Sequence, residues 1–333
     1  MDIVKTIQEQ MAAIKKYDSS IFLDTVFTHL QRAEYFFRQG KETSDDQFYT
    51  DVIYRCNQAF EGGLKEAYKI LAQKDEHSVS QETPNNIEKY FASNKLFKDR
   101  VLKQFENYRK EWRNKSTHDH KLFFDQSEAF LALVSVSAFI YLLFNQILEQ
   151  LGFANSVAQS NNLPRNSESL ANLAITEAIE LIIDSFLQQF EKSSVDTSMK
   201  EQVFSGMLHG FLAQTFPQIK IRREPLIVSN NYLLRPDFVF EINNSPCILE
   251  VKRRIDIGVR DADIHQVITY MNATGARHAV LFYYARSDRK MLKQTATHTI
   301  NAKTYHIVVY APAPAANLFT SLAHKDSSPT IDN

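Results

Sequence analysis

Apolar residues recur at three- and four-residue spacing through the first half of the chain. This spacing lines one side of an α-helix and predicts a succession of helices. The predicted helices cover residues 2–16, 20–39, 45–74, 97–112 and 122–150. Stretches rich in helix-capping residues lie between them, at 18–20 (DSS), 43–46 (TSDD) and 82–86 (ETPNN). The pattern therefore predicts an all-helical N-terminal half.

The period of the pattern changes in the second half. Strands are expected in five segments rich in β-branched and aromatic residues, at 219–228, 234–243, 246–254, 278–285 and 304–312. Helices are expected at 171–192, 198–215, 260–273 and 288–297. Strands that alternate with helices indicate an α/β sheet covered by helices. Residues 151–170 are rich in Ser and Asn and predict a linker between the halves.

Length and composition fit one large domain or two ordinary ones. The chain has 333 residues, of which 44% are hydrophobic, and a formal net charge of -1. No global basic field marks a nucleic-acid-binding protein, so local patches must carry any such role. Cys56 and Cys247 lie far apart and favour a reducing, cytoplasmic setting without disulfides. No stretch at the N-terminus resembles a signal peptide.

One segment, 129–148, carries no charge and is about long enough to span a bilayer. It contains four polar residues, Ser135, Ser137, Asn145 and Gln146. Acidic residues flank it and no cationic flank suggests an orientation. A buried core helix is therefore the favoured interpretation, a membrane span is the alternative, and no membrane partner is expected.

The segment 235–254, RPDFVFEINNSPCILEVKRR, places charged residues at the ends of two expected strands. Side chains alternate between the faces of a strand, and NNSP predicts a short turn. Asp237 should therefore lie beside Glu250 and Lys252 in a hairpin. Two neighbouring carboxylates repel each other unless a positive charge lies between them, and a hard divalent cation suits their oxygen atoms. Lys252 would orient or activate water, or stabilise charge on a phosphate.

Asp237 after a proline, followed by Glu250-Val251-Lys252, resembles the PD-(D/E)xK nuclease superfamily. Gln266 and Tyr270, four positions apart on a helix, resemble the QxxxY element of its RecB-type members. The resemblance covers about residues 195–312. It implies a hydrolytic nuclease that uses Mg²⁺ or Mn²⁺, with DNA the expected substrate and RNA the alternative.

The resemblance also implies a helix carboxylate that assists the metal, and Glu201 is the candidate. Metal ligands would then be Asp237, Glu250 and Glu201, with Gln266 and Tyr270 in support. Glu191 and other nearby acids compete with Glu201 for this role. His265 precedes Gln266, as a His does in some relatives, although an ordinary exposed His explains it equally well.

Basic residues gather around these motifs in the sequence and would contact phosphates without reading bases. The proposed nucleic-acid contacts are Arg235, Arg253, Arg254 and Arg260. Other members of the cluster are Arg222, Arg223, Arg277, Arg286, Arg289 and Lys290. Solvated strand-end charges are the competing explanation.

The helical half carries a second candidate site. Arg113 is separated from His118 by four residues. This spacing resembles the Rx4–6H motif of HEPN domains, which are helical bundles that often act as metal-independent ribonucleases. The resemblance covers about residues 1–150 and implies a homodimer, with Asn114 as an auxiliary residue. Five helical positions leave Arg113 and His118 roughly 140° apart, so the helix must bend or end between them. His120 is an alternative imidazole.

The segment 54–68 resembles the early HEPN helix, with Arg55, Asn57 and Glu61 spaced along it.

The expected protein is α+β overall. It begins with a HEPN-like bundle (1–150) and a linker (151–170). An α/β restriction-endonuclease-like domain with a mixed sheet (171–315) and a tail (316–333) follow. The expected activity is Mg²⁺-dependent cleavage of phosphodiester bonds, and the family resemblance implies a prokaryotic antiviral defence or toxin-type effector. The alternatives are a metal-independent ribonuclease whose C-terminal domain binds nucleic acid, and a non-catalytic binding or dimerisation protein.

Overall fold

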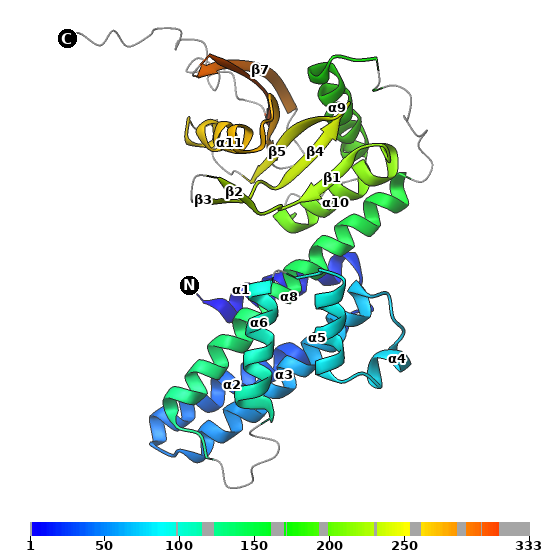
Figure 1. Ribbon diagram of the computed structural model, residues 1–333. Coiled ribbons are helices and arrows are strands. Elements are labelled where there is room, and N and C mark those ends of the chain that lie inside the picture. Colours follow the sequence, from blue (N-terminus) through cyan, green and yellow to red (C-terminus); the bar gives the residue numbers. More distant parts are fainter. Residues whose placement is uncertain are drawn as a thin grey trace, which may run out of the picture. The chain divides into compact units, whose positions relative to one another are not determined.

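The chain divides into two units, Met1–Gly152 and Phe153–Asn333, in a computed structural model of the protein. The structure describes residues 2–97, 99–114, 123–160, 170, 172–192, 199–229, 232–253, 261–284, 291–300 and 302–312. Helices build the first unit and a mixed sheet with helices builds the second, so the α+β class is confirmed (Figure 1). We call the first the helical unit and the second the sheet unit.

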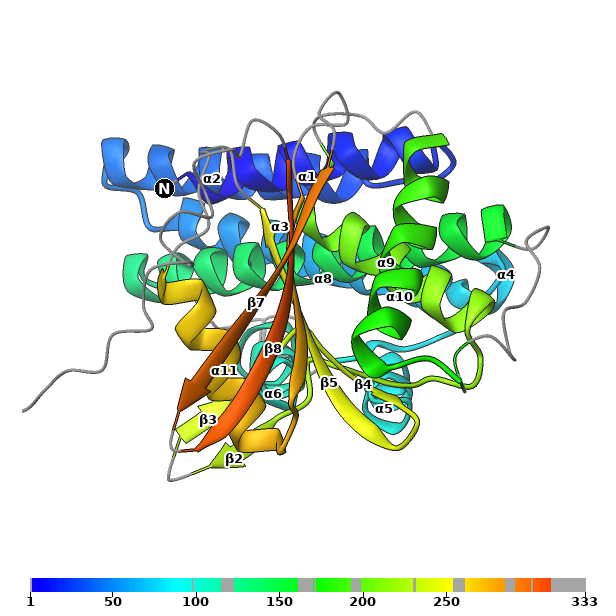
Figure 2. The same ribbon diagram turned by 90° about the horizontal axis from the view of Figure 1, so that it is seen from above.

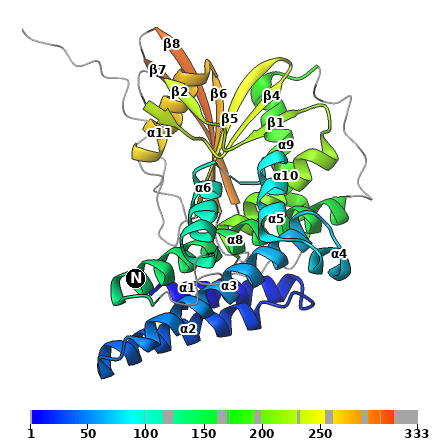
Figure 3. The same ribbon diagram turned by 60° about the horizontal axis from the view of Figure 1, so that its bottom comes forward.

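The helical unit follows the predicted periodicity closely. Its elements are α1 (Ile3–Tyr17), α2 (Asp24–Thr43), α3 (Gln47–Leu71), α4 (Glu76–Ser80), α5 (Pro84–Ser93), α6 (Asp99–Tyr108), η1 (Arg109–Arg113) and α8 (Gln126–Ser160). The part of α8 from Phe153 onward belongs to the sheet unit. Side chains of Asp2, Asp75 and Thr83 accept hydrogen bonds from backbone N–H groups in the first turns of α1, α4 and α5. The long helices α2 and α3 pack side by side (Figure 3).

Aromatic side chains form much of the interior of the helical unit. The ring of Phe139 on α8 lies 4.6 Å from that of Phe60 on α3 and 4.2 Å from that of Phe105 on α6, between centroids. By length and composition α8 could cross a membrane, and 56% of its most apolar 18-residue window is buried in the structure. Its buried side agrees with the interpretation of 129–148 as a core helix.

The sheet unit contains three long helices and eight strands among the residues that the structure describes. They are α9 (Ile175–Lys192), α10 (Glu201–Thr215), β1 (Lys220–Arg223), β2 (Ile227–Ser229), β3 (Tyr232–Leu234), β4 (Phe238–Ile242), β5 (Ser245–Arg253), α11 (Asp261–Thr274), β6 (His278–Tyr284), β7 (Met291–Ile300) and β8 (Lys303–Pro312).

Six strands form one mixed sheet in the order β1-β4-β5-β6-β8-β7, and β2 and β3 form a separate hairpin. Strands β4 and β5 pair antiparallel across a two-residue turn, Asn243-Asn244, with φ of 49° and 62°. Asn tolerates these positive angles, which a tight hairpin requires. The expected β4–β5 hairpin is therefore confirmed. Strands β5, β6 and β8 run parallel, with α11 connecting β5 to β6.

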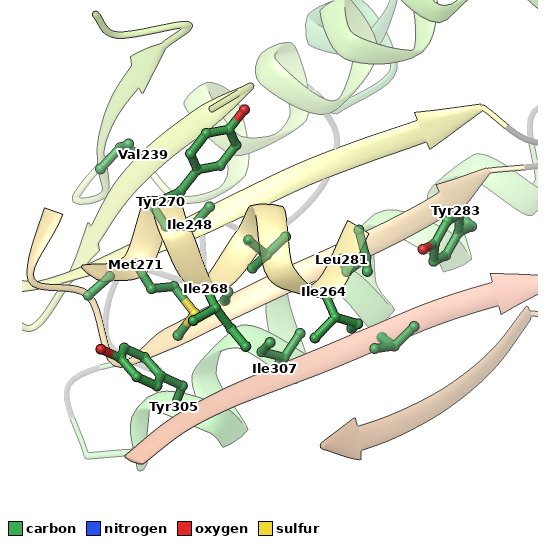
Figure 4. Packing of buried hydrophobic residues seen from close by; sticks show 14 of the residues in the cluster. Val239, Ile248, Ile264, Ile268, Tyr270, Met271, Leu281, Tyr283, Tyr305 and Ile307 are labelled. Atoms are coloured by element: carbon green, nitrogen blue, oxygen red, sulfur yellow. The ribbon is translucent and has the colours of Figure 1, made fainter. Parts of the chain in front are cut away.

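Helices cover both faces of the sheet. Figure 2 shows α9 and α10 on one face and α11 with the β2–β3 hairpin on the other. On the α10 face, Phe204 stacks on Tyr284 at 4.4 Å between ring centroids. On the α11 face, Ile264, Ile268 and Met271 pack against strand residues such as Leu281 (Figure 4). Alternate residues of the central strands thus fill two cores.

Several predicted elements differ from the structure. The helix predicted over 288–297 is wrong, because Met291–Ile300 forms strand β7. Its antiparallel pairing with all of β8 and its β-branched threonines outweigh the helix propensity of Lys, Leu and Gln. The first part of the linker predicted over 151–170 is wrong, because α8 continues to Ser160. Residues 161–169 lie outside the described residues.

Two predicted strands are each divided in two. The segment 219–228 is interrupted near Pro225 and 234–243 near Pro236. Proline has no N–H to donate to a strand ladder, which ends the pairing at both positions. The short helices α4 and α5 were not predicted.

Candidate active site

Asp237 and Glu250 face each other where β4 begins and β5 nears its end. The register pairs Phe238 with Leu249, so Asp237 lies opposite Glu250. The backbone N–H of Val251 donates to Oδ2 of Asp237 at 2.7 Å, and that of Asp237 donates to Oε2 of Glu250 at 3.2 Å. Each carboxylate is thus held by the backbone of the opposite strand, and the predicted proximity is confirmed.

Lys252 links Glu250 to helix α11. Its Nζ donates to Oε1 of Glu250 at 2.7 Å and to Oε1 of Gln266 at 2.9 Å. Nε2 of Gln266 in turn donates to the hydroxyl of Tyr270 at 2.7 Å. Four-residue spacing places Gln266 and Tyr270 on one side of α11. The structure therefore joins both predicted motifs in one hydrogen-bonded chain.

Burial and neighbouring negative charges shift both carboxyl groups toward the protonated form. Burial, followed by the charge of Glu250, raises the pKa of Asp237 to about 7. Burial likewise raises the pKa of Glu250, although the hydrogen bond from Lys252 opposes the shift. Without a further cation, the pair therefore holds a proton near neutral pH.

The pKa of Lys252 is also raised, but for a lysine this favours the charged form. Burial alone would lower the pKa of its ammonium group, but the hydrogen bond to Glu250 and the charges of Glu250, Asp237 and Asp263 raise it overall. Lys252 therefore stays positively charged at neutral pH.

Glu201 is the first residue of α10 and is exposed over much of its surface. Partial burial of its carboxyl group raises its pKa, against the attraction of Lys252 and Arg253. Its charge also acts on Asp237 and Glu250. Within the described part of the chain, however, no three His, Cys, Asp or Glu side chains are close enough together to hold a metal ion. Glu201 thus lies near the pair without completing a three-residue ligand group.

The competing candidates add little to this site. The side chain of Glu191 is not among those described. His265 is exposed, and its Nδ1 lies 2.7 Å from the carbonyl oxygen of Asp261, one turn earlier in α11. The imidazole of His265 therefore contacts the backbone of its own helix.

The predicted basic cluster is only partly assembled. Arg222 and Arg253 are exposed, and Nη1 of Arg235 lies 3.7 Å from Oε2 of Glu224. Arg277 precedes the first residue of β6, at the opposite end of the parallel strands from Lys252, and its guanidinium covers the ring of Tyr305. It therefore does not belong to the site. Five cations lie outside the described residues: Arg254, Arg260, Arg286, Arg289 and Lys290.

Asp263 is a site neighbour that sequence reasoning missed. It is buried in the first turn of α11 and accepts a hydrogen bond from the hydroxyl of Tyr283 at 2.8 Å. Its charge contributes to the raised pKa of Lys252. The available signal was its position three residues before Gln266, which places both on one side of the helix.

The candidate site of the helical unit is described only in part. Nε of Arg113 donates to Oε1 of Glu61 at 2.6 Å, and its Nη1 donates to Oδ1 of Asn114 at 3.3 Å. Residues Arg109–Arg113 form a π-helix, an irregularity often found at functional sites. His118 and His120 lie outside the described residues.

Two other residues of the early HEPN-like segment have contacts of their own. Oδ1 of Asn57 accepts a hydrogen bond from the hydroxyl of Tyr108 at 2.9 Å in the core. Nη1 of Arg55 lies 3.3 Å from Nδ1 of His29. Of the three residues spaced along α3, therefore, Glu61 is the one paired with Arg113.

Comparison with known proteins does not assign a family. No family model matches the chain, and no curated protein matches its sequence. The functional interpretation therefore depends on the geometry of the site itself.

Proposed function

We propose that the sheet unit is a metal-dependent nuclease of the PD-(D/E)xK type. The observation that supports this most is the convergence of Asp237, Glu250 and Lys252 at the adjoining ends of two paired strands. The site also lies where the parallel strand β5 ends, the edge at which open α/β sheets commonly bind ligands.

The residues fit a hard divalent cation. Asp237 and Glu250 supply carboxylate oxygens, and their raised pKa values reflect negative charge that is incompletely neutralised. Mg²⁺ is commonly held by only one or two protein carboxylates, with water and substrate phosphate completing its shell. Such an ion, when bound, would polarise a phosphate oxygen and lower the pKa of a bound water.

Lys252 is best suited to stabilising charge. Because its pKa is raised, it carries a proton at neutral pH and is a poor general base. Its ammonium group is held by Glu250 and Gln266, and Gln266 is held by Tyr270. A fixed positive charge of this kind stabilises the extra negative charge that develops on phosphorus-bound oxygens during hydrolysis.

The substrate class follows from the surroundings of the site. Arg222 and Arg253 are exposed and would contact phosphates. DNA is the substrate that we propose first. A role as a prokaryotic antiviral or toxin-type effector is supported only by the resemblance of the motifs.

The test is cleavage of plasmid DNA and structured RNA with Mg²⁺ or with EDTA. Asp237→Ala should abolish metal-dependent cutting, and Lys252→Ala should slow it by about 10²–10³-fold. Glu241→Ala is the matched control, because Glu241 lies on β4 four residues from Asp237, and its Oε2 lies 3.7 Å from Nζ of exposed Lys220. Equal activity in all three variants would refute the proposed site.

A second activity is favoured by the Arg113–Glu61 pair beside a π-helix. The helical unit would then cleave RNA without a metal, with His118 as general base on a ribose hydroxyl and Arg113 stabilising the phosphate. RNA cutting that resists EDTA and is lost in His118→Ala would support this role. Unchanged cutting in that variant would exclude it.

A further inference from the structure

Two histidines from neighbouring strands lie side by side at the end of the sheet opposite the candidate active site. His278 is the first residue of β6 and pairs in parallel register with His306 of β8. Their side chains point to the same face of the sheet, with the ring centroids 5.2 Å apart. Lys252, by contrast, pairs with Tyr283 near the other end of β6. The two imidazoles therefore form a cluster separate from the carboxylate pair.

Each imidazole has a threonine hydroxyl beside its Nδ1 atom. Oγ1 of Thr176 in α9 lies 3.3 Å from Nδ1 of His278. Oγ1 of Thr297 in β7 lies 3.4 Å from Nδ1 of His306. When Nδ1 carries the proton and donates it to the threonine, the lone pair of the ring is on Nε2. Metal-binding histidines commonly have their other nitrogen held in this way, because it fixes the tautomer and the orientation of the ring.

The Nε2 atoms of both rings are available to a ligand. Neither makes a hydrogen bond with a residue that the structure describes, and both side chains are half-buried, so solvent reaches them. Burial, followed by the charge of His306, lowers the pKa of His278. His278 is therefore neutral at pH 7, and the neutral imidazole is the form that binds a metal.

The chemistry and the spacing of the pair select the class of ligand. Imidazole nitrogens bind Zn²⁺, Cu²⁺ and Ni²⁺, whereas Mg²⁺ needs oxygen atoms. Two imidazoles that share one tetrahedral zinc ion, with Zn–N distances of about 2.0–2.1 Å, have ring centroids roughly 5 Å apart. The observed 5.2 Å is close to this spacing. The rings are near-parallel, with 18° between their planes, and must turn to bring both Nε2 atoms to one ion.

Cys247 is the next residue in the same row, because it pairs with His278 across β5 and β6. Its thiol is buried and donates to the carbonyl oxygen of Ser245 at 3.7 Å, and burial raises its pKa to about 12. A thiol that keeps its proton is a poor metal ligand. Among the residues that the structure describes, no third His, Cys, Asp or Glu completes a metal-binding group with the two imidazoles. The chain thus supplies two donors.

We propose that His278 and His306 together bind one borderline divalent cation, represented by Zn²⁺, with water completing its shell. The ion bridges β6 and β8 and belongs to a different chemical class from the hard cation expected at Asp237 and Glu250. This inference does not depend on the proposed nuclease function. Because the ion binds the folded sheet unit, it stabilises that unit against unfolding.

The experiment titrates the metal-free full chain with ZnCl₂ at neutral pH in an excess of MgCl₂. Isothermal titration calorimetry counts the zinc ions bound by each protein. The test variants are His278→Gln, His306→Gln and Thr297→Val. His298→Gln is the matched control, because His298 follows Thr297 on β7 but its Nε2 is buried.

His278→Gln and His306→Gln should each bind one zinc ion fewer than the wild type, and His298→Gln should bind the same number. Thr297→Val keeps the shape of the side chain and removes the hydroxyl. It should bind the ion about tenfold more weakly, as is typical when a partner of a metal-binding histidine is lost. ZnCl₂ should raise the Tm of the wild type and the control by more than that of the two test variants that lack a histidine of the pair.

A measurement on the wild type avoids any effect of the substitutions on folding. Diethyl pyrocarbonate modifies imidazoles that have a free nitrogen, and mass spectrometry locates the product. ZnCl₂ should protect His278 and His306 from this modification, and MgCl₂ should not. Modification of both histidines that ZnCl₂ leaves unchanged would overturn the inference. The same number of bound zinc ions in the wild type, His278→Gln and His306→Gln would overturn it as well.

Discussion

Nζ of Lys252 lies 2.7 Å from Oε1 of Glu250, two residues earlier on the same strand. Residues two apart in a strand point to the same face, so this ion pair is built into the Glu-Val-Lys tripeptide. The opposite strand adds Asp237 to the same point. A lysine beside two carboxylates partly neutralises them, and its removal should change both charge and chemistry.

Lys252→Ala should reduce the rate of phosphodiester cleavage by about 10²–10³-fold, the cost typical of removing one charge-stabilising donor from an active site. The loss should appear in kcat, because the ammonium acts on charge that develops during reaction. Single-turnover cleavage of a saturating substrate measures it. A change in KM alone would assign Lys252 to substrate binding instead.

The stability of the metal-free protein should fall as the pH rises. The pKa of Asp237 is raised from 3.8 to about 7 on folding, so between these values the folded state binds more protons than the unfolded state. The contribution of Asp237 to stability is therefore fully present below about pH 4 and is lost as the pH rises through about 7, by on the order of 2–4 kcal/mol. Thermal unfolding in EDTA from pH 4.5 to pH 8 measures this slope.

Asp237→Asn provides the control for that slope, because it removes the titrating group and keeps the shape of the side chain. The Tm of this variant should depend less on pH than that of the wild type. A slope that is identical in both proteins would show that other groups govern the pH dependence.

Gln266→Ala should lower the cleavage rate about tenfold, because Lys252 loses the acceptor that fixes its position. Tyr270→Phe should have a smaller effect, since it removes only the hydrogen bond to Gln266. Gln266→Glu keeps an acceptor at the same place and should recover most of the rate. If Gln266→Ala cuts as fast as wild type, the hydrogen bonds from Tyr270 through Gln266 do not position Lys252.

Gly210→Ala should destabilise the sheet unit by more than about 1 kcal/mol. A β-carbon at Gly210 would lie 2.5 Å from the carbonyl oxygen of Phe153, a backbone atom that cannot move aside cheaply. Urea denaturation measures the change, with Ser205→Ala on the same helix as the control. Equal midpoints for the two variants would contradict this close approach of α10 to the end of α8.

The central hairpin could be predicted because local rules determine it. Alternation along the strands and the Asn243-Asn244 turn set the register that brings Asp237 to Glu250. The four-residue spacing of Gln266 and Tyr270 placed both on one side of a helix. Each of these relationships depends on residues close in sequence.

Features that depend on distant parts of the chain were not predicted. Strand β7 has helix-forming residues and becomes a strand because β8 offers it a full-length partner. The position of Glu201 depends on how α10 packs against the sheet, which local spacing does not fix. The exposure of Val228 and Leu233 on the β2–β3 hairpin was also missed, because short apolar runs in the sequence resemble those of buried strands.

The most direct test of the central claim is anomalous diffraction from a crystal of the full chain soaked in MnCl₂. We expect a manganese ion bonded to the carboxylates of both Asp237 and Glu250. Well-ordered carboxylates with no anomalous peak between them, in crystals of a protein that still cuts DNA, would contradict it.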